Sequence, residues 1–280
     1  MERYETLKAL IAELPGALVA YSGGADSAFL ADVAHEVLGD RMVAVTAVSE
    51  SLAPEERAQA AEVARARGWH HEEIETHEIE RPEYRRNSGD RCFYCKDELF
   101  DVLDALAVER RASVLVGTNL DDTGDFRPGI RAAREHGVRA PLVEAGLRKE
   151  EIRELSRARG LQTWDKPASA CLASRIAYGI EVTPGRLDRV ARAESLLREM
   201  GLRQLRVRDH GELARIEVPL EDVERLAEPA KRAHIVERFK ELGFHHVTLD
   251  LEGFRSGSMN ASLLTIGRPS GAPQNLIGEA

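Results

Sequence analysis

Residues 17–27 read ALVAYSGGADS, so that a short apolar run stands directly before a turn with two adjacent glycines. The run is typical of a buried strand, and helical spacing of apolar residues follows at Leu30, Val33 and Val37. Such a strand–turn–helix can hold a phosphate group, because glycines let backbone N–H groups approach an anion and the helix N-terminus adds partial positive charge. A plain glycine turn before a capped helix is the simpler interpretation, but the serines at both ends and Asp26 favour a phosphate cradle.

Details of this turn exclude two other phosphate-binding loops. No lysine follows Gly24, so the cation that reaches the β- and γ-phosphates in a Walker loop is missing. The glycines also lack the spacing of the dinucleotide-binding fold. We therefore expect the anion to be held by the loop residues themselves, which are Ser22, Gly23, Gly24, Asp26 and Ser27.

The same alternation of apolar runs and helical patterns continues along the first part of the chain. Further strands are expected at residues 42–48, 71–76 and 113–117, with the third of these four strands weaker and edge-like. Helices are expected from Pro54 to Gly68 and over residues 93–110. This order predicts an α/β fold with a parallel sheet, in which the functional site lies at the carboxyl ends of the strands.

A second turn rich in oxygen ligands follows the strand at residues 113–117. It reads Gly117-Thr118-Asn119-Leu120-Asp121-Asp122. Asn/Asp-rich loops are common and need no ligand. Because this turn is expected at the same sheet edge as the glycine loop, Asn119 and Asp122 are candidates for binding a nucleotide or Mg²⁺.

Changes in composition divide the chain into four segments. Residues 1–165 form the expected parallel-sheet domain, and residues 166–185 form a junction that carries Cys171. Residues 186–265 alternate helices and short strands, which predicts a smaller α+β domain. Residues 266–280 are rich in Gly, Pro and Ser and are expected to be a loose tail.

Composition narrows the class of protein and its compartment. The 280 residues carry 39 Lys and Arg against 48 Asp and Glu, a net charge of −9, which disfavours nucleic acid as the main partner. No apolar run approaches the roughly 20 residues of a membrane span, and the charged N-terminal residues do not resemble a signal peptide. We therefore expect a cytoplasmic protein without a membrane partner. In that compartment its three cysteines are candidates for metal binding or catalysis in preference to disulfide bonding.

The cysteines stand in two places. Cys92 and Cys95 are three residues apart at the start of a predicted helix, so both sulfurs lie on one face, as a metal or cluster site needs. Small buried side chains are the commoner fate of such a pair. Cys171 lies in the junction, where Arg175 is expected to lower its pKa and make it a nucleophile.

The glycine loop resembles the Ser-Gly-Gly-x-Asp-Ser motif of the PP-loop ATP pyrophosphatase superfamily, whose fold is adenine nucleotide alpha hydrolase-like. The resemblance implies that ATP binds at Ser22 to Ser27, that Mg²⁺ bridges its phosphates, and that pyrophosphate is released while a substrate is adenylated. Asn119 and Asp122 fit this arrangement as further nucleotide or magnesium ligands.

Nearly the whole chain is similar to the LarE family of ATP-dependent sulfur transferases, on the glycine loop, residues 91–96, 117–122 and the Cys-Leu-Ala-Ser-Arg segment at 171–175. The resemblance implies a pyridinium dicarboxylate mononucleotide as substrate, whose carboxylates become thiocarboxylates for the nickel-pincer cofactor of lactate racemase. The sulfur comes either from Cys171, which is then sacrificed, or from a 4Fe–4S cluster. The latter would be held by Cys92, Cys95 and Cys171, and the presence of all three favours it.

The resemblance also implies a substrate pocket and an assembly state. Arg206 and Arg208 alternate on one face of a predicted strand, which suits a clamp for the substrate phosphate; a solvated charged strand face is the ordinary alternative. Arg175 and Glu194 are weaker candidates for the same pocket. The family resemblance further suggests a homo-oligomer, such as a hexamer built as a trimer of dimers.

Three other functions fit part of the sequence. A tRNA thiolase of the same superfamily would also use ATP and cysteines, but it would need a basic RNA-binding surface. An amidotransferase-type synthetase leaves the cysteines without a role. A non-catalytic ATP-binding regulator would release no pyrophosphate with any acid.

Overall fold

A four-stranded parallel sheet organises the first part of the chain. The computed structural model describes residues 2–124, 128–167 and 170–255. The strands are β1 (Ala17–Ala20), β2 (Met42–Val48), β3 (His70–Glu75) and β4 (Ser113–Val116), in the order β3-β2-β1-β4. Every neighbouring pair in this sheet is parallel, which confirms the predicted α/β class, and the polar strand β3 lies at an edge as expected.

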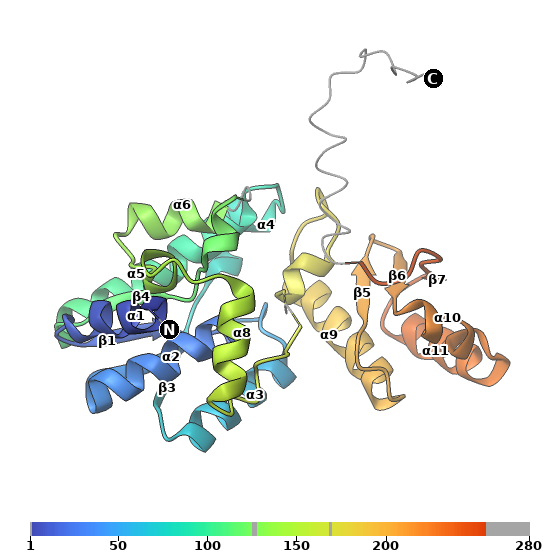
Figure 1. Ribbon diagram of the computed structural model, residues 1–280. Helices are drawn as coiled ribbons and strands as arrows, with labels where there is room; N and C mark the ends of the chain where they lie inside the picture. Colours follow the sequence, from blue (N-terminus) through green and yellow to red (C-terminus); the bar gives the residue numbers. More distant parts are fainter. Residues whose placement is uncertain (1, 125–127, 168–169, 256–280) are drawn as a thin grey trace, which may run out of the picture. The chain divides into compact units, whose positions relative to one another are not determined.

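Helices cover both faces of this sheet (Figure 1). Side chains alternate along each strand, so Val19 faces one core and Leu18 the other. The first core includes buried residues of α1 (Glu2–Ala12), α2 (Ala25–Leu38), α3 (Pro54–Arg67) and α8 (Lys149–Ala158). The second core packs α5 (Arg91–Arg110) and α6 (Pro128–Glu135) against the opposite face.

Several short elements lie in the connections between the longer helices and strands. They are η1 (Gly39–Arg41), η2 (Glu78–Glu80), α4 (Pro82–Arg85), η3 (Leu120–Gly124), α7 (Pro141–Glu144) and η4 (Leu172–Arg175). No helix within the described ranges is long and apolar enough to cross a membrane.

The chain divides into two compact units that interleave in sequence. Among the described residues, the first unit contains those of 2–173 and 181–191, and the second contains 174–180 and 192–255. The helix α9 (Pro184–Glu199) therefore contributes to both. The predicted tail at 266–280 lies outside the described residues.

The second unit is an α+β layer with its own apolar core. Its sheet has the order β5-β6-β7, from β5 (Arg206–Asp209), β6 (Leu213–Glu217) and β7 (His246–Leu249). The pair β5–β6 is antiparallel and β6–β7 is parallel. The helices α9, α10 (Leu220–Ala227) and α11 (Pro229–Glu241) supply the remaining core residues, which include Leu197, Leu226 and Phe239.

The strand order determines where a ligand can bind in the first unit. The chain runs from β1 to β2 on one side, and β4 lies on the other side of β1. Their carboxyl ends form a topological switch point, where the turns that follow β1 and β4 lie next to each other. These are the turns that carry the glycine loop and Asn119.

Candidate active site

The glycine loop connects β1 to α2 in a conformation that requires glycine. Gly23 has φ +72°, and a Cβ atom there would lie 3.1 Å from the Cβ of Ala60. Gly24 is the N-cap of α2, with φ −82° and no hydrogen bond from a side chain to the helix end. The first amide groups of this 14-residue helix therefore remain available to an anion.

The two serines of the loop are linked to each other. The Ser22 N–H donates to Ser27 Oγ over 3.2 Å, and the two hydroxyl oxygens lie 3.1 Å apart. Ser27 Oγ also donates to the Gly24 carbonyl oxygen at 3.2 Å. These bonds close the loop around its backbone amides and place Ser22, which is exposed, at its rim.

Gly117, the first residue after β4, lies directly against the start of α2. A Cβ atom at Gly117 would lie 2.8 Å from both the backbone N and the Cα of Ser27, and 3.0 Å from the carbonyl carbon of Asp26. Only glycine allows this approach. It brings the turn after β4 next to the glycine loop.

Asp26, Asn119 and Asp122 meet at this contact. Asn119 is fully buried, and its Nδ2 donates to Asp26 Oδ2 over 3.2 Å. The Asn119 backbone N–H donates to Asp122 Oδ2, also over 3.2 Å. Asp26 Oδ1 is buried without a hydrogen-bond partner. The site thus contains an uncommitted carboxylate oxygen beside a second carboxylate, a donor set that suits Mg²⁺.

The pKa of Asp26 reflects the same crowding. Burial raises it above the ordinary value, and the negative charge of Asp122 raises it further. The cation of Lys149 and the hydrogen bond from Asn119 act in the opposite direction without cancelling the rise. A divalent cation bound here would favour the charged carboxylate.

A lysine from a distant segment reaches the glycine loop. Lys166 Nζ donates to the Gly23 carbonyl oxygen over 3.1 Å and lies 2.7 Å from Glu56 Oε2 on α3. Its side chain is only 14% exposed. No lysine directly follows the glycines in the sequence, and the fold supplies one from 143 residues beyond Gly23.

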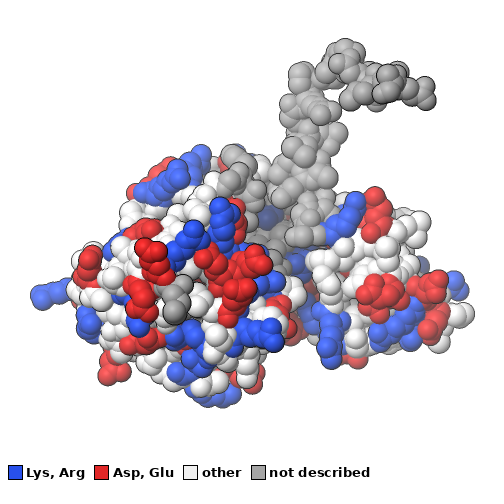
Figure 2. Space-filling view, viewed as in Figure 1, with Lys and Arg blue, Asp and Glu red and all other residues white. Residues whose placement is uncertain are grey.

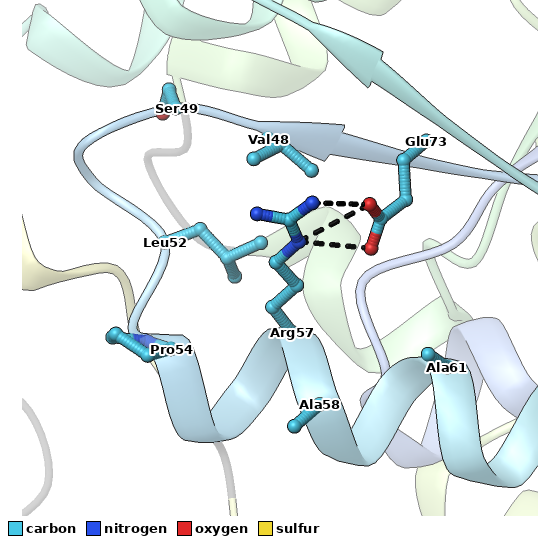
Figure 3. Close-up of a pocket in the computed structure, with 8 residues that line it drawn as sticks. All are labelled: Val48, Ser49, Leu52, Pro54, Arg57, Ala58, Ala61 and Glu73. Carbon is cyan, nitrogen blue, oxygen red and sulfur yellow. Dashed lines mark hydrogen bonds and ion pairs between the residues drawn. The ribbon is translucent and has the colours of Figure 1, made fainter.

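A pocket of about 350 Å³ opens between the end of β2, the loop that follows it and α3 (Figure 3). Its apolar lining comes from Val48, Leu52, Pro54, Ala58 and Ala61. Figure 3 also shows the guanidinium of Arg57 paired with the carboxylate of Glu73, with Nη2 and Oε2 2.6 Å apart, and Ser49 on the loop. An apolar slot with a few polar groups on its rim suits a flat aromatic ring.

The three cysteines lie in one neighbourhood of the first unit, together with Glu78 and Tyr84, which were not predicted from the sequence as site residues. Cys95 lies on α5, and burial raises the pKa of its thiol, with further rises from the nearby acidic groups Glu78, Cys171 and Cys92. Burial likewise raises the pKa of Tyr84, and Cys171 and Cys95 raise it further. Cys92 and Cys171 are exposed, and none of the three cysteines forms a disulfide.

Glu78 is the uncommitted group of this neighbourhood. It is 2% exposed; its Oε1 accepts a 2.6 Å hydrogen bond from Ser49 Oγ, and its Oε2 is buried without a partner. Ser49 also lines the pocket of Figure 3, so the pocket and the cysteines are linked through this pair.

Two backbone contacts fix the segment that follows Cys171. The Leu172 N–H donates to the Ser51 carbonyl oxygen over 2.9 Å, and Arg91 Nη1 donates to the Ala173 carbonyl oxygen, also over 2.9 Å. Ser51 lies in the loop after β2, whereas Arg91 begins α5. The fold therefore attaches the Cys171 segment to the elements that carry Ser49 and Cys95.

Cys92, Cys95 and Cys171 are the residues that would hold a 4Fe–4S cluster, since thiolates are the ligands of such clusters. Within the described residues, no group of three His, Cys, Asp or Glu side chains is placed to hold one metal ion. A 4Fe–4S cluster needs thiolates that are spread around a larger object. Burial raises the pKa of the Cys95 thiol and so favours its neutral form, which means that ligation would need the positive charge of the bound group to favour the thiolate.

The other four candidate residues lie together in the second unit. Arg175 and Glu194 form a buried pair, with Nε and Oε1 2.9 Å apart and exposures of 3% and 0%. Arg208 pairs with Glu217 at 2.9 Å and also donates to the Ser174 carbonyl oxygen over 3.0 Å. The Arg175 guanidinium pairs with Glu194, and its expected effect on the Cys171 thiol stays a prediction.

The pKa of Arg206 is perturbed by its position in this group. Burial lowers its pKa to about 10, and the cations of Arg175 and Arg208 contribute to the decrease. Burial alone would raise the pKa of Glu194, but Arg175 lowers it below the ordinary value. Three guanidinium groups thus share one region of the second unit, where an added phosphate would relieve their mutual repulsion.

No family model matches the chain, but three individual proteins are similar to it. An uncharacterized protein of Synechocystis sp. is 46% identical over 262 residues, covering 93% of this chain and 98% of that protein. The pyridinium-3,5-bisthiocarboxylic acid mononucleotide synthase of Lactiplantibacillus plantarum is 36% identical over 260 residues, covering 92% and 94%. An uncharacterized protein of Methanocaldococcus jannaschii is 30% identical over 172 residues, covering 61% and 66%.

Proposed function

The chain belongs to the LarE family, to which the pyridinium-3,5-bisthiocarboxylic acid mononucleotide synthase belongs, and from this premise we propose its reaction. Membership makes it an enzyme of sulfur transfer in the synthesis of the nickel-pincer cofactor. Its substrate is pyridinium-3,5-biscarboxylic acid mononucleotide, and ATP activates each carboxylate before sulfur replaces one of its oxygens. The enzyme acts in the cytoplasm as a homo-oligomer.

Activation is needed because a carboxylate is a poor electrophile. A substrate carboxylate oxygen attacks the α-phosphorus of ATP, the bond to the β-phosphate oxygen breaks, and pyrophosphate leaves. The amides of the glycine loop and the hydroxyls of Ser22 and Ser27 bind the phosphates. Asp26, Asn119 and Asp122 would hold Mg²⁺, which supplies charge stabilisation for the leaving pyrophosphate.

The pocket beside α3 accommodates the base of the nucleotide. The helix α3 contributes residues to both places, because Ala58 and Ala61 line the pocket and Ala60 would contact a Cβ atom at Gly23. Its volume of about 350 Å³ and its apolar walls suit an adenine ring.

In the sacrificial route, Cys171 provides the sulfur. Its thiolate attacks the acyl carbon, the bond to the phosphate oxygen breaks, and AMP leaves. A base then removes the Cα proton of Cys171, the Cβ–S bond breaks, and its electron pair stays on the sulfur of the thiocarboxylate. Cys171 becomes dehydroalanine, so one chain transfers one sulfur.

In the cluster route, Cys92, Cys95 and Cys171 would hold a 4Fe–4S cluster that supplies a transferable sulfide in place of the cysteine sulfur. The shared neighbourhood of the thiols and the buried, unpartnered Oε2 of Glu78 support this route. The second unit would bind the phosphate of the substrate through Arg206 and Arg208, with Arg175 and Glu194 holding that surface in place.

The strongest support is the group formed by Asp26, Asn119 and Asp122. Asp26 Oδ1 in this group is buried without a hydrogen-bond partner, and a bound cation would provide one. The test is to incubate the purified protein with Mg-ATP and the dicarboxylated nucleotide, and to measure AMP and pyrophosphate. We expect both products only when this acid is present, with nicotinic acid mononucleotide as the matched control. Pyrophosphate release in the absence of any acid would overturn the proposal. A complete lack of pyrophosphate release with both acids would also overturn it.

Two measurements distinguish the sulfur routes. Mass spectrometry after one turnover shows a loss of H₂S from the peptide that contains Cys171 in the sacrificial route, and an unchanged peptide in the cluster route. Cys92→Ala abolishes sulfur transfer only in the cluster route, whereas Cys171→Ala abolishes it in both and leaves adenylation measurable. Full activity of Cys92→Ala would remove the preference for a cluster.

A tRNA-thiolating enzyme is the alternative, and it would need a basic surface. In the view of Figure 2, acidic and basic side chains are interspersed over the face of each unit, without a large basic area. Binding of tRNA that weakens steeply with salt, together with thiolation of its bases, would favour this alternative.

A further inference from the structure

Lys166 is the basic side chain that contacts the carbonyl group of the glycine loop. Its Nζ lies 3.1 Å from the Gly23 carbonyl oxygen and 2.7 Å from Glu56 Oε2. A lysine ammonium group has three N–H donors, and these two acceptors use two of them. With 14% of its side chain exposed, the ammonium is held in place beside the loop and retains a donor for a ligand.

The contact with Gly23 also orients the loop. Within the described chain every peptide bond is trans, so the carbonyl and the following N–H point in opposite directions across the peptide plane. Fixing the Gly23 carbonyl on Lys166 turns the Gly24 N–H away from Lys166. Gly24 is the N-cap of α2, so this N–H is one of the donors at the anion-binding helix end.

We propose that Lys166 is a catalytic residue that binds the β- and γ-phosphates of ATP and stabilises the departing pyrophosphate. This inference rests on the proposed function. The loop lacks the lysine that follows the glycines in a Walker motif, and Lys166 brings the equivalent charge from another part of the chain. Glu56 and the Gly23 carbonyl hold the ammonium while no nucleotide is bound. Because the Gly24 N–H points away from Lys166, the ammonium leaves both of these partners to contact a phosphate bound at that N–H.

The reaction adds negative charge where Lys166 stands. As the bond from the α-phosphorus to the bridging oxygen breaks, its electron pair moves to pyrophosphate, and a cation within hydrogen-bond distance stabilises that charge. Lys166 also lies five residues before Cys171, so the residue that binds the leaving group and the sulfur nucleophile belong to one segment.

The test compares Lys166→Met and Lys166→Arg with Lys8→Met as the matched control. Lys8 lies on α1 of the same unit and is likewise paired with a glutamate, Glu36, at 3.0 Å. Binding of ATP, AMP and inorganic pyrophosphate is measured by calorimetry on the full chain, and pyrophosphate release is measured with the dicarboxylated nucleotide. The melting temperature of each variant is recorded.

We expect Lys166→Met to weaken the binding of ATP and of pyrophosphate about 10-fold to 100-fold, the size of one lost charge-assisted contact. Binding of AMP, which lacks the β- and γ-phosphates, changes less than about twofold. Lys166→Arg retains part of the affinity, and Lys8→Met behaves like the unmodified chain. Glu56→Gln, which removes the competing carboxylate, binds ATP more tightly.

Three results would overturn the inference. They are unchanged ATP affinity in Lys166→Met, an equal loss of ATP and AMP affinity, or a loss that follows the melting temperature rather than the phosphates. Failure of the proposed function itself is distinguishable, because the unmodified chain would then bind no ATP and release no pyrophosphate. If Lys166→Met does not fold, the loss of pyrophosphate affinity in Lys166→Arg decides the question.

Discussion

The close approach of Gly117 to the start of α2 gives a prediction that links packing to catalysis. In Gly117→Ala, the new Cβ would lie 2.8 Å from the backbone N and Cα of Ser27, closer than real Cβ atoms come. Backbone cannot rotate away as a flexible side chain can, so α2 must move. Overpacking of this kind costs about 1–3 kcal/mol in the free energy of unfolding, and each kcal/mol lowers the melting temperature of a domain of this size by roughly 2–4 °C.

The movement also has a functional consequence, because it separates Asp26 from Asn119, which lies two residues after Gly117. We expect pyrophosphate release to fall at least about tenfold at saturating substrate, while the variant still folds. Gly185→Ala is the matched control: a Cβ at Gly185 meets no heavy atom within 4 Å, and its position in the first turn of α9 tolerates alanine. The reasoning is refuted if Gly117→Ala unfolds and releases pyrophosphate like the Gly185→Ala control.

Two further predictions concern buried and paired charges. His136 lies 2.7 Å from Asp104 and 3.1 Å from Asp97, and although burial lowers its pKa, these carboxylates raise it above the ordinary value. The stabilisation by His136 is therefore complete below the unfolded-state pKa of about 6.5 and is lost as the pH rises through the folded-state pKa. We expect urea unfolding to show the largest loss of stability in His136→Gln near pH 5.5 and the smallest near pH 8.5. An equal loss at both pH values would contradict this. Arg208→Met leaves the fully buried Glu217 with one cation fewer and should lower the unfolding free energy by about 3 kcal/mol. The double variant Arg208→Met/Glu217→Gln should regain most of this stability. If Arg208→Met is as stable as the unmodified chain, the buried pair does not contribute as we expect.

Much of the fold follows from strongly patterned segments. The strand expected at residues 42–48 is present with the same bounds, because it is apolar on both faces and ends at clear turns. The helix expected from residue 93 begins at Arg91, since Cys92 already has helical geometry. The helices between β4 and residue 160 were not assigned individually, because they are short and weakly apolar, although Pro128 and Pro141 mark two of their first turns.

The site was predictable where neighbouring residues form a motif and not where the fold assembles it. The glycine loop and Asn119 could be proposed from sequence, because each directly follows an apolar strand. Lys166 could not, because it reaches Gly23 across 143 residues, and neither could Glu78, which is an ordinary surface residue by its sequence context. A pattern search for lysine next to glycine cannot find a cation that arrives from another segment.

The most direct test of adenylation uses the dicarboxylated nucleotide labelled with oxygen-18 in both carboxylates. If a carboxylate oxygen attacks the α-phosphorus and the acyl carbon is later attacked by sulfur, the released AMP carries one labelled oxygen for each thiocarboxylate formed. AMP without label, or label in inorganic phosphate alongside ADP, would contradict the account.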